Sequence, residues 1–200
     1  MPSPRTAARQ QKIRAHIIES ATGTVGRHGY AKATMARIAE DAGVAYGSIY
    51  LHFRGHDDLL AQLLPSVNEL LRSAIRARSK GARTFLDHEA IGFDVLFEVT
   101  LENPGRRRVF SEAPFYVPDA YDAYLARMAA AYSRVMHACK AKGEFPHLDE
   151  DQFETIAYSL MGAKQFLLNR FCHGCDAPRQ APANVRATYL KMVENAVSRP

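Results

Sequence analysis

The sequence lacks the features of membrane-embedded or exported proteins. No run approaches the roughly 18 consecutive apolar residues that a membrane-spanning helix requires, and Met1–Arg5 lacks the apolar core of a secretory signal peptide. The chain has only three cysteines in 200 residues, an odd number that argues against a disulfide framework. We therefore expect a cytoplasmic protein with no membrane partner.

Catalytic motifs are also missing from the sequence. It contains no glycine-rich phosphate loop, no Gly-x-Ser-x-Gly, no His-Glu-x-x-His, and no carboxylate pair spaced to share a helix face with a histidine. Cys172, His173 and Cys175 resemble metal ligands, but a zinc site needs four, and His137 and Cys139 on another helix would have to complete it. We interpret the cysteines as inert thiols, with a reversible disulfide as the alternative. We expect no enzyme, no metal and no cofactor.

Helical periodicity is what the sequence does contain, with almost no alternating strand pattern. A chain of 200 residues with 47% hydrophobic content can bury a substantial core, as one large or two small domains. Apolar residues recur three and four positions apart through most of the chain, which predicts an all-α fold. Helices are expected over 12–25, 59–80 with a kink or break at Pro65, 84–103, 106–112, 118–142, 148–173 and 183–198, with a loop over 113–118.

Residues 34–53 predict two short helices joined by a tight turn. Thr34 can cap the first helix by accepting a backbone hydrogen bond. Gly43 follows where a helix ends in the left-handed region, which a residue without Cβ enters at no steric cost. The apolar side of this pair consists of Met35, Ile38, Ala39, Ala42, Val44, Ile49 and Phe53. This pattern is typical of a DNA-reading helix-turn-helix, although an ordinary helical hairpin is the alternative.

The outer side of the second helix carries Tyr46, Gly47, Ser48 and Tyr50. Small residues matter there because a helix enters a major groove of about 12 Å only if its leading residues let the backbone approach the bases. The sequence therefore predicts that these residues face DNA.

The charge distribution supports the same interpretation. Residues 1–56 contain eight Lys and Arg against three Asp and Glu, whereas the remainder has eighteen of each, so the whole net charge of +5 lies in the N-terminal part. A basic region supplies the sequence-independent attraction to phosphates that dominates affinity for DNA. Arg5, Arg9 and Lys12 can extend along the DNA backbone or into a minor groove. The alternative is a basic terminus that is merely solvated.

Residues 9–60 resemble the DNA-binding domain of the TetR/AcrR family of bacterial regulators. The matching positions are Ala21, Gly29, Tyr30, Thr34, Ile38, Ala39, Ala42, Gly43, Val44, Gly47, Tyr50, Phe53 and Leu59. The resemblance implies a three-helix DNA-binding domain over 1–56 and an all-helical effector-binding and dimerisation domain over 57–200. It implies a DNA-binding site that includes Ala45, with base contacts from Tyr46, Gly47 and Ser48. Phosphate contacts are implied for Thr34, Tyr50, His56, Arg9 and Lys12.

Two positions depart from the family pattern. The family usually has serine or threonine at the position of Ala45, where the side chain caps the recognition helix, and the loss of a cap costs about 0.5–2 kcal/mol. It often has lysine at the position of His56, and a histidine that is mostly neutral at pH 7 attracts phosphate less. We expect these changes to alter affinity for DNA rather than the mode of docking.

The resemblance also implies a homodimer formed through the last two helices. The small and apolar residues of 148–173, together with Leu190, Val193 and Val197, fit a dimeric four-helix bundle. The alternative is that these helices only complete the monomer core. A two-fold dimer presents two reading helices to two half-sites.

The family's usual input is a small molecule bound among the middle helices. The expected effector-binding residues are Phe93, Phe97, Phe110, Phe115, Tyr116, Tyr121, Tyr124, Phe166 and Asn169, with His88 as a further orienting group and Phe85 as a further interior aromatic. Packed core is the alternative for each aromatic. Arg106, Arg107 and Arg108 would either meet an anionic ligand, such as an acyl-coenzyme A phosphate, or be solvated.

Together these observations predict a ligand-responsive repressor that binds a palindromic operator as a homodimer and is released by a small, largely apolar effector. An activator or a ligand-insensitive repressor is the alternative within the same fold. A helical sensor or interaction protein that no longer binds DNA specifically is the alternative outside it.

Overall fold

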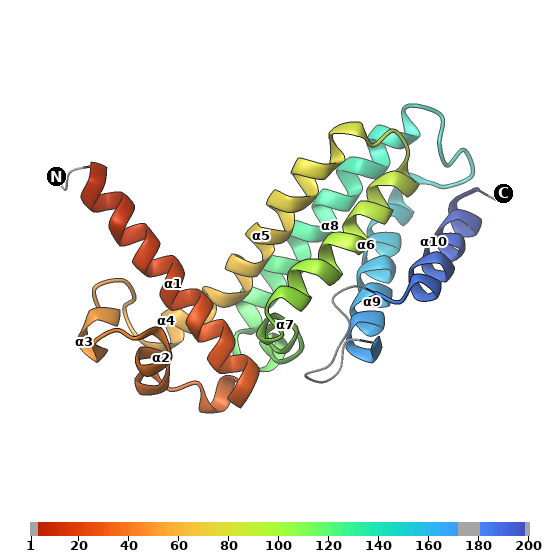
Figure 1. Ribbon diagram of the computed structural model, residues 1–200. Helices are drawn as coiled ribbons and strands as arrows, with labels where there is room; N and C mark the ends of the chain where they lie inside the picture. The colour runs from red at the N-terminus through yellow and green to blue at the C-terminus, as the bar shows by residue number, and fades with distance from the viewer. Residues whose placement is uncertain (1–3, 172–180, 199–200) are drawn as a thin grey trace. The chain divides into compact units, whose positions relative to one another are not determined.

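The computed structural model describes residues 4–171 and 181–198. Throughout these ranges the chain forms helices and turns without a strand, which confirms the predicted all-α class (Figure 1). None of the described helices is long and apolar enough to cross a membrane. Cys172, His173 and Cys175 lie outside the described residues, so their state stays a prediction.

The order of elements follows the sequence periodicity closely. The α-helices are α1 (Pro4–His28), α2 (Met35–Ala42), α3 (Tyr46–Ile49), α4 (His56–Ala61), α5 (Leu63–Arg78), α6 (Phe85–Glu102), α7 (Gly105–Tyr116), α8 (Pro118–Lys140), α9 (Phe153–Phe171) and α10 (Ala183–Ser198). Single 3-10 turns are η1 (Tyr30–Lys32), η2 (Ser79–Gly81) and η3 (Glu150–Gln152).

The expected kink or break at Pro65 takes the form of a helix break at Gln62, three residues before the proline. The end of α4 is capped by the backbone of Gln62, and α5 starts at Leu63. Pro65 then lies in the first turn of α5, where backbone N–H groups have no partner within the helix and the missing donor costs little. The proline is therefore compatible with the start of a helix and does not distort one.

The prediction of a loop over 113–118 is wrong. Helix α7 runs through Pro114 to Tyr116, and the chain leaves the helical conformation only at Val117 before α8 begins. The proline removes one backbone donor, but burial of Val109, Phe110 and Ala113 holds this helix in place. Helix α7 is therefore longer than the sequence periodicity predicted, because the burial of these side chains depends on tertiary contacts.

The chain divides into two compact units. The first consists of Met1–Glu69 with Asn103–Asp122, and the second of Leu70–Glu102 with Ala123–Pro200. Helix α7 therefore packs with α1 although the chain reaches it only after α6. The functional boundary expected at residue 56 stays a prediction.

The first unit is held together by an apolar core and by a close approach of α1 and α7. A Cβ built on Gly105 would lie 2.2 Å from the carbonyl oxygen of Thr22, and one on Gly26 would lie 2.4 Å from the Cα of Gly105. Glycine is therefore required where these backbones meet. Buried core side chains of this unit include Ile17, Ala21, Val25, Ile38, Ile49, Phe53 and Leu59.

Two of the three consecutive arginines of α7, Arg106 and Arg108, form ion pairs within the first unit. Arg106 has a side chain that is only 8% exposed, and its Nη2 lies 2.9 Å from Oε1 of Glu19 on α1. Arg108 pairs with Glu112 one turn along α7. Neither alternative expected from the sequence describes Arg106, because its partner is a carboxylate of its own unit.

The second unit has a core that four helices share. Buried residues of α6, α8, α9 and α10 pack into one cluster, which includes Phe93, Phe97, Met136, Phe153, Leu160, Leu168, Val185, Tyr189 and Val193. The ring of Phe93 stacks on both Phe97 and Tyr189, with centroids 4.6 and 5.0 Å apart. Three of these helices, α6, α8 and α9, also supply residues that line the pocket of this unit.

Candidate DNA-binding site and effector pocket

The helix-turn-helix has the predicted local geometry. Thr34 caps α2, its hydroxyl accepting a long 3.4 Å hydrogen bond from the backbone N–H of Arg37. Gly43 ends the helix in the left-handed region, with φ 61° and ψ 32°. Ala45 precedes α3 in an extended conformation and makes no side-chain cap. Each of these features follows from the residue type that the sequence places there.

The outer face of α3 is exposed, as expected. Tyr46 and Tyr50 are 52% and 49% exposed, while Ile49 between them is fully buried. Gly47 is exposed, and a Cβ built on it would meet nothing within 4 Å. Ser48 is half-buried. The face therefore offers hydroxyl groups and a bare backbone edge to an approaching surface.

Tyr46 and Tyr50 form a pair that the sequence analysis did not anticipate. Their rings meet edge to face with centroids 5.6 Å apart, and their hydroxyl oxygens lie 3.1 Å apart. The hydrogen bond with Tyr46 raises the pKa of Tyr50 above its usual range, so the Tyr50 phenol stays protonated at pH 7. Their spacing of four residues on one helix face is the signal that predicts such a pair.

The expected phosphate-binding residues differ in what their side chains contact. The Nε2 atom of His56 lies 2.8 Å from the carbonyl oxygen of Ala33, which ties the start of α4 to the residue before the cap of α2. Arg9 and Lys12 are exposed, but they belong to α1 and not to an extended arm. The guanidinium of Arg14 lies 5.0 Å from the centroid of the Phe53 ring.

A second unpredicted contact fixes α2 on α1. Asp41 accepts hydrogen bonds from the hydroxyl of Thr24 and from Arg27, whose Nη2 lies 2.5 Å from Oδ2. The Thr24 hydrogen bond and then Arg27 lower the pKa of Asp41 below its usual range. Asp41 was counted in the sequence only as a surface charge, because its partners are 14 and 17 residues away.

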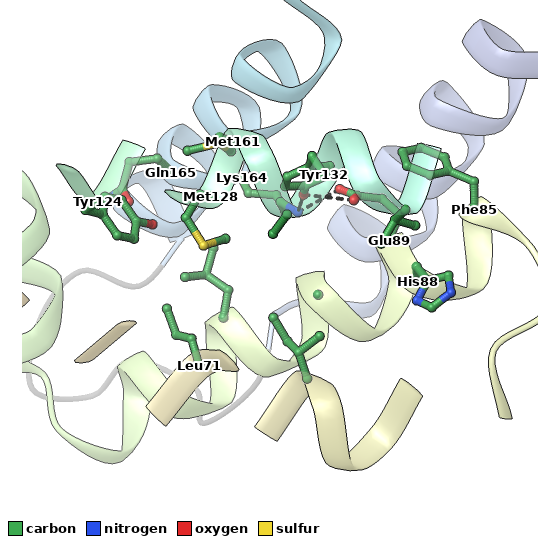
Figure 2. Close-up of a pocket in the computed structure, with 15 residues that line it drawn as sticks. Leu71, Phe85, His88, Glu89, Tyr124, Met128, Tyr132, Met161, Lys164 and Gln165 are labelled. Atoms are coloured by element: carbon green, nitrogen blue, oxygen red, sulfur yellow. Dashed lines mark hydrogen bonds and ion pairs between the residues drawn. The ribbon is translucent and has the colours of Figure 1, made fainter. Parts of the chain in front are cut away.

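The second unit contains an open pocket with about 830 Å³ of space between its side chains, its mouth included (Figure 2). Its lining residues come from α5, α6, α8 and α9: Leu71, Ile75, Phe85, His88, Glu89, Gly92, Leu96, Tyr124, Met128, Ala131, Tyr132, Val135, Met161, Lys164 and Gln165.

Among the nine expected effector-binding residues, Tyr124 is the one that lines this pocket. The further orienting group His88 and the aromatic Phe85 line it as well. Phe93 and Phe97 are buried in the core cluster instead. Asn169 accepts a hydrogen bond from Gln165, so it lies behind a lining residue. Most of the expected aromatic residues therefore lie outside this pocket, and their role toward an effector stays a prediction.

The remaining expected effector residues lie elsewhere. The prediction that Phe115 and Phe166 are interior is wrong, because these side chains are 81% and 80% exposed. On α9, Phe166 is two positions from both Lys164 and Leu168, which places it on another side of the helix. Phe110, Tyr116 and Tyr121 belong to the first unit, where Tyr116 stacks on Tyr30 with centroids 5.5 Å apart.

A buried polar cluster in the pocket wall escaped the sequence analysis. The Nζ atom of Lys164 lies 2.7 Å from Oε1 of Glu89, and the two side chains are 6% and 3% exposed. Tyr132 donates a 2.9 Å hydrogen bond to Oε2 of Glu89 (Figure 2). Tyr189 donates a hydrogen bond to Oε1 of the same carboxylate. The signal in the sequence was a lysine within the apolar stripe of α9. The described residues contain no group of three or more side chains suited to a metal ion.

Comparison with known proteins agrees with the fold and the N-terminal motif. Residues 17–63 match the family model of bacterial regulatory proteins, tetR family. The HTH-type transcriptional regulator TtgR of Pseudomonas putida is 45% identical over 65 residues, which are 32% of this chain and 31% of that protein. A probable acrEF/envCD operon repressor of Escherichia coli K12 is 36% identical over 76 residues, or 36% and 34% of the two chains. The chain thus spans about a third of the length of these curated relatives.

The likeness in three dimensions extends over nearly the whole chain. A TetR-family transcriptional regulator from Syntrophomonas wolfei, known from its crystal structure, superposes with a TM-score of 0.77 at 17% identity, covering 94% of this chain and 96% of that one. At this identity the likeness concerns the fold, and the N-terminal sequence match supplies the family. Residues 17–63 therefore belong by sequence to the tetR family of bacterial regulatory proteins, and the described chain shares the fold of TetR-family regulators.

Proposed function

We propose that the protein is a transcriptional repressor that reads its operator with the outer face of α3. The observation that carries the proposal is the exposed Tyr46 and Gly47 beside the half-buried Ser48, on the side of α3 away from the fully buried Ile49. Such an edge can approach base pairs in a major groove without a change in packing. The Escherichia coli relative described as a probable operon repressor favours repression over activation. A regulator of this family is not an enzyme, and it works where bacterial DNA lies, in the cytoplasm.

We assign different roles to the residues around this edge. Tyr46 and Ser48 contact base edges, while Thr34, Tyr50 and the exposed Arg9 and Lys12 hold phosphates. His56 is a positioning residue in this proposal, because its Nε2 atom is engaged by the carbonyl of Ala33. Ala45 contributes only backbone at the start of α3.

We propose that the protein acts as a homodimer on a palindromic operator, through α9 and α10. Tyr158 and Phe166 are 39% and 80% exposed and lie eight residues apart, with Gly162 midway on the same face of α9. Met192 on α10 is 52% exposed. Large apolar side chains exposed on neighbouring helices are typical of a surface that another subunit covers.

The pocket of the second unit would bind the effector in this proposal. Its concave shape and largely apolar lining suit a small molecule. A bound effector would favour a separation of the two reading helices that no longer matches the operator. The ligand shifts this balance only by the difference between its affinities for the two arrangements.

DNA binding is tested by fluorescence anisotropy with labelled duplexes from the region beside the gene. We expect a specific complex whose affinity for its best sequence falls in S48A and Y46F, with relaxed preference among sequences. R9Q/K12Q should instead weaken binding to every duplex and flatten its salt dependence. Absence of any specific complex would favour a helical sensor or interaction protein, and identical behaviour of both variant classes would refute the assigned roles.

Dimerisation is tested by sedimentation of the purified full chain. Replacing Phe166 with glutamate should yield monomers that have lost most specific DNA binding, because a charge opposes burial of this surface. The matched control is F115E, at a phenylalanine equally exposed but on α7. A wild-type protein that sediments as a monomer would overturn the dimer.

A further inference from the structure

The acidic group in the polar wall of the pocket, the Glu89 carboxylate, already has most of its hydrogen-bonding positions occupied. Glu89 accepts three hydrogen bonds, from Lys164, Tyr132 and Tyr189. Burial raises the pKa of both tyrosines far above the usual range, so these phenols stay protonated and keep donating. A ligand that offers a hydrogen-bond donor would have to displace one of these partners from Glu89.

The basic side of the same wall retains a free donor. An ammonium group has three N–H bonds, and within the described residues Lys164 directs hydrogen bonds to Glu89 and Tyr132. The neighbouring position on α6 is Gly92, where even an added Cβ would remain 3.7 Å from Nζ. Because Lys164 and Gly92 both line the pocket, space remains beside the ammonium for an acceptor atom.

The net charge of the pair restricts the ligand further. Glu89 and Lys164 neutralise each other at 2.7 Å. A carboxylate placed on Lys164 would bring a second negative charge close to Glu89, and an ammonium ligand would add a second positive charge close to Lys164. An uncompensated buried charge is strongly unfavourable. An uncharged acceptor engages the free N–H without this cost.

We propose that the pocket binds an uncharged, largely apolar compound whose carbonyl-type oxygen accepts a hydrogen bond from Lys164. The apolar body would lie against Leu71, Leu96, Met128 and Met161, which line the rest of the cavity (Figure 2). The regulatory meaning of this ligand rests on the proposed function, but its binding does not.

Four compounds of eleven carbons, each with one benzene ring, test this chemistry on the full chain in the absence of DNA. Valerophenone carries a ketone, pentylbenzene has a methylene in its place, 4-butylbenzoate is an anion and 4-butylbenzylammonium is a cation. The measurement is the dissociation constant, from the ligand-dependent rise of the unfolding midpoint. We expect valerophenone to bind at least about tenfold more tightly than each of the others. Its ketone oxygen accepts a hydrogen bond from the charged Lys164, which pentylbenzene cannot do. The benzoate and the ammonium compound would each add a charge beside the Glu89–Lys164 pair.

Variants identify the donor. In E89Q/K164M, where both charges are removed together, the ketone should lose its advantage and bind about as well as pentylbenzene, whose own affinity should stay within about twofold. The matched control is K80M, an exposed lysine of the same unit outside the pocket lining. This double variant avoids leaving one buried charge without its partner.

Several outcomes would overturn the inference. These are equal affinity of the ketone and the hydrocarbon, tighter binding of the benzoate or the ammonium compound, a ketone preference that survives in E89Q/K164M, and failure of all four compounds to bind. If valerophenone binds as expected but does not release DNA, the ligand chemistry is supported and the effector role within the proposed function fails.

Discussion

The two units of this protein build their candidate sites in opposite ways. In the first, residues 34–53 supply cap, turn and exposed edge from one continuous segment. In the second, the pocket takes residues between Leu71 and Gln165 from four helices. A surface that reads another molecule requires only that a short motif fold with one side outward. A pocket requires several helices to leave space among them, and this depends on packing far apart in sequence.

The ion pairs of the two units differ in how far they are exposed to solvent. The Arg27–Asp41 pair of the first unit has side chains that are 54% and 30% exposed. The Lys164–Glu89 pair of the second is almost completely buried. Exposed pairs are worth about 0–1 kcal/mol, whereas removing one partner of a buried pair costs about 3–5 kcal/mol. Charge substitutions should therefore affect the stability of the second unit far more.

The largest effect is expected from K164M alone. The variant leaves the Glu89 carboxylate buried without its cation, so we expect a loss of about 3–5 kcal/mol in the free energy of unfolding, measured with urea. E89Q/K164M should recover most of this loss because neither charge remains. If K164M and the double variant were equally unstable, the single loss would reflect packing of the lysine stem and not charge.

G105A should have the next largest effect and brings the first unit into the comparison. The added Cβ would lie 2.2 Å from the carbonyl oxygen of Thr22, so α7 must shift from α1. We expect about 1–3 kcal/mol of destabilisation by urea unfolding. G81A is the control, since a Cβ there would meet no atom within 4 Å. Similar losses in both variants would contradict the close helix contact.

A45S should stabilise the protein. The residue before α3 is extended, with φ −62° and ψ 138°, and lacks a side-chain cap, so a serine hydroxyl there can accept a free N–H of the first turn. We expect a gain of about 1 kcal/mol in the free energy of unfolding. A36S, at an exposed position within α2, should give no gain. If the free energy of unfolding of A45S equalled that of the wild type, the missing cap before α3 would not limit the stability of the protein.

D41N should have the smallest effect and depend on pH. The folded-state pKa of Asp41 is lowered, so its contribution is present above the ordinary carboxyl pKa of about 3.9 and lost as the pH falls through the lowered value. We expect a loss of at most about 1 kcal/mol at pH 7, because Asp41 and Arg27 are partly exposed. The difference from wild type in urea unfolding should shrink at pH 3. A difference that stays constant with pH would exclude the carboxylate as its source.

The sequence predicted the local geometry of the helix-turn-helix, whereas the roles of its residues toward DNA stay predictions. Thr34, Gly43 and Ile49 act in the structure as their side chains suggested, because capping, left-handed turns and helix faces depend on neighbours within four positions. The sequence failed at Phe166, which is exposed, and at Lys164, which is buried in a pair with a residue 75 positions away. Aromatic or charged character alone does not say which neighbours a residue will meet.

Residue order by itself determined the all-α class, the helix-turn-helix and its outward edge, and the confinement of net charge to residues 1–56. Only the tertiary structure decided that α7 packs on α1 through Gly26 and Gly105, and that Glu89, Tyr132, Lys164 and Tyr189 converge beside a cavity. The physical reason is the sequence distance over which each interaction acts. Helix propensity and capping act over one turn, whereas a buried ion pair and the space next to it exist only after distant helices have excluded water from between them.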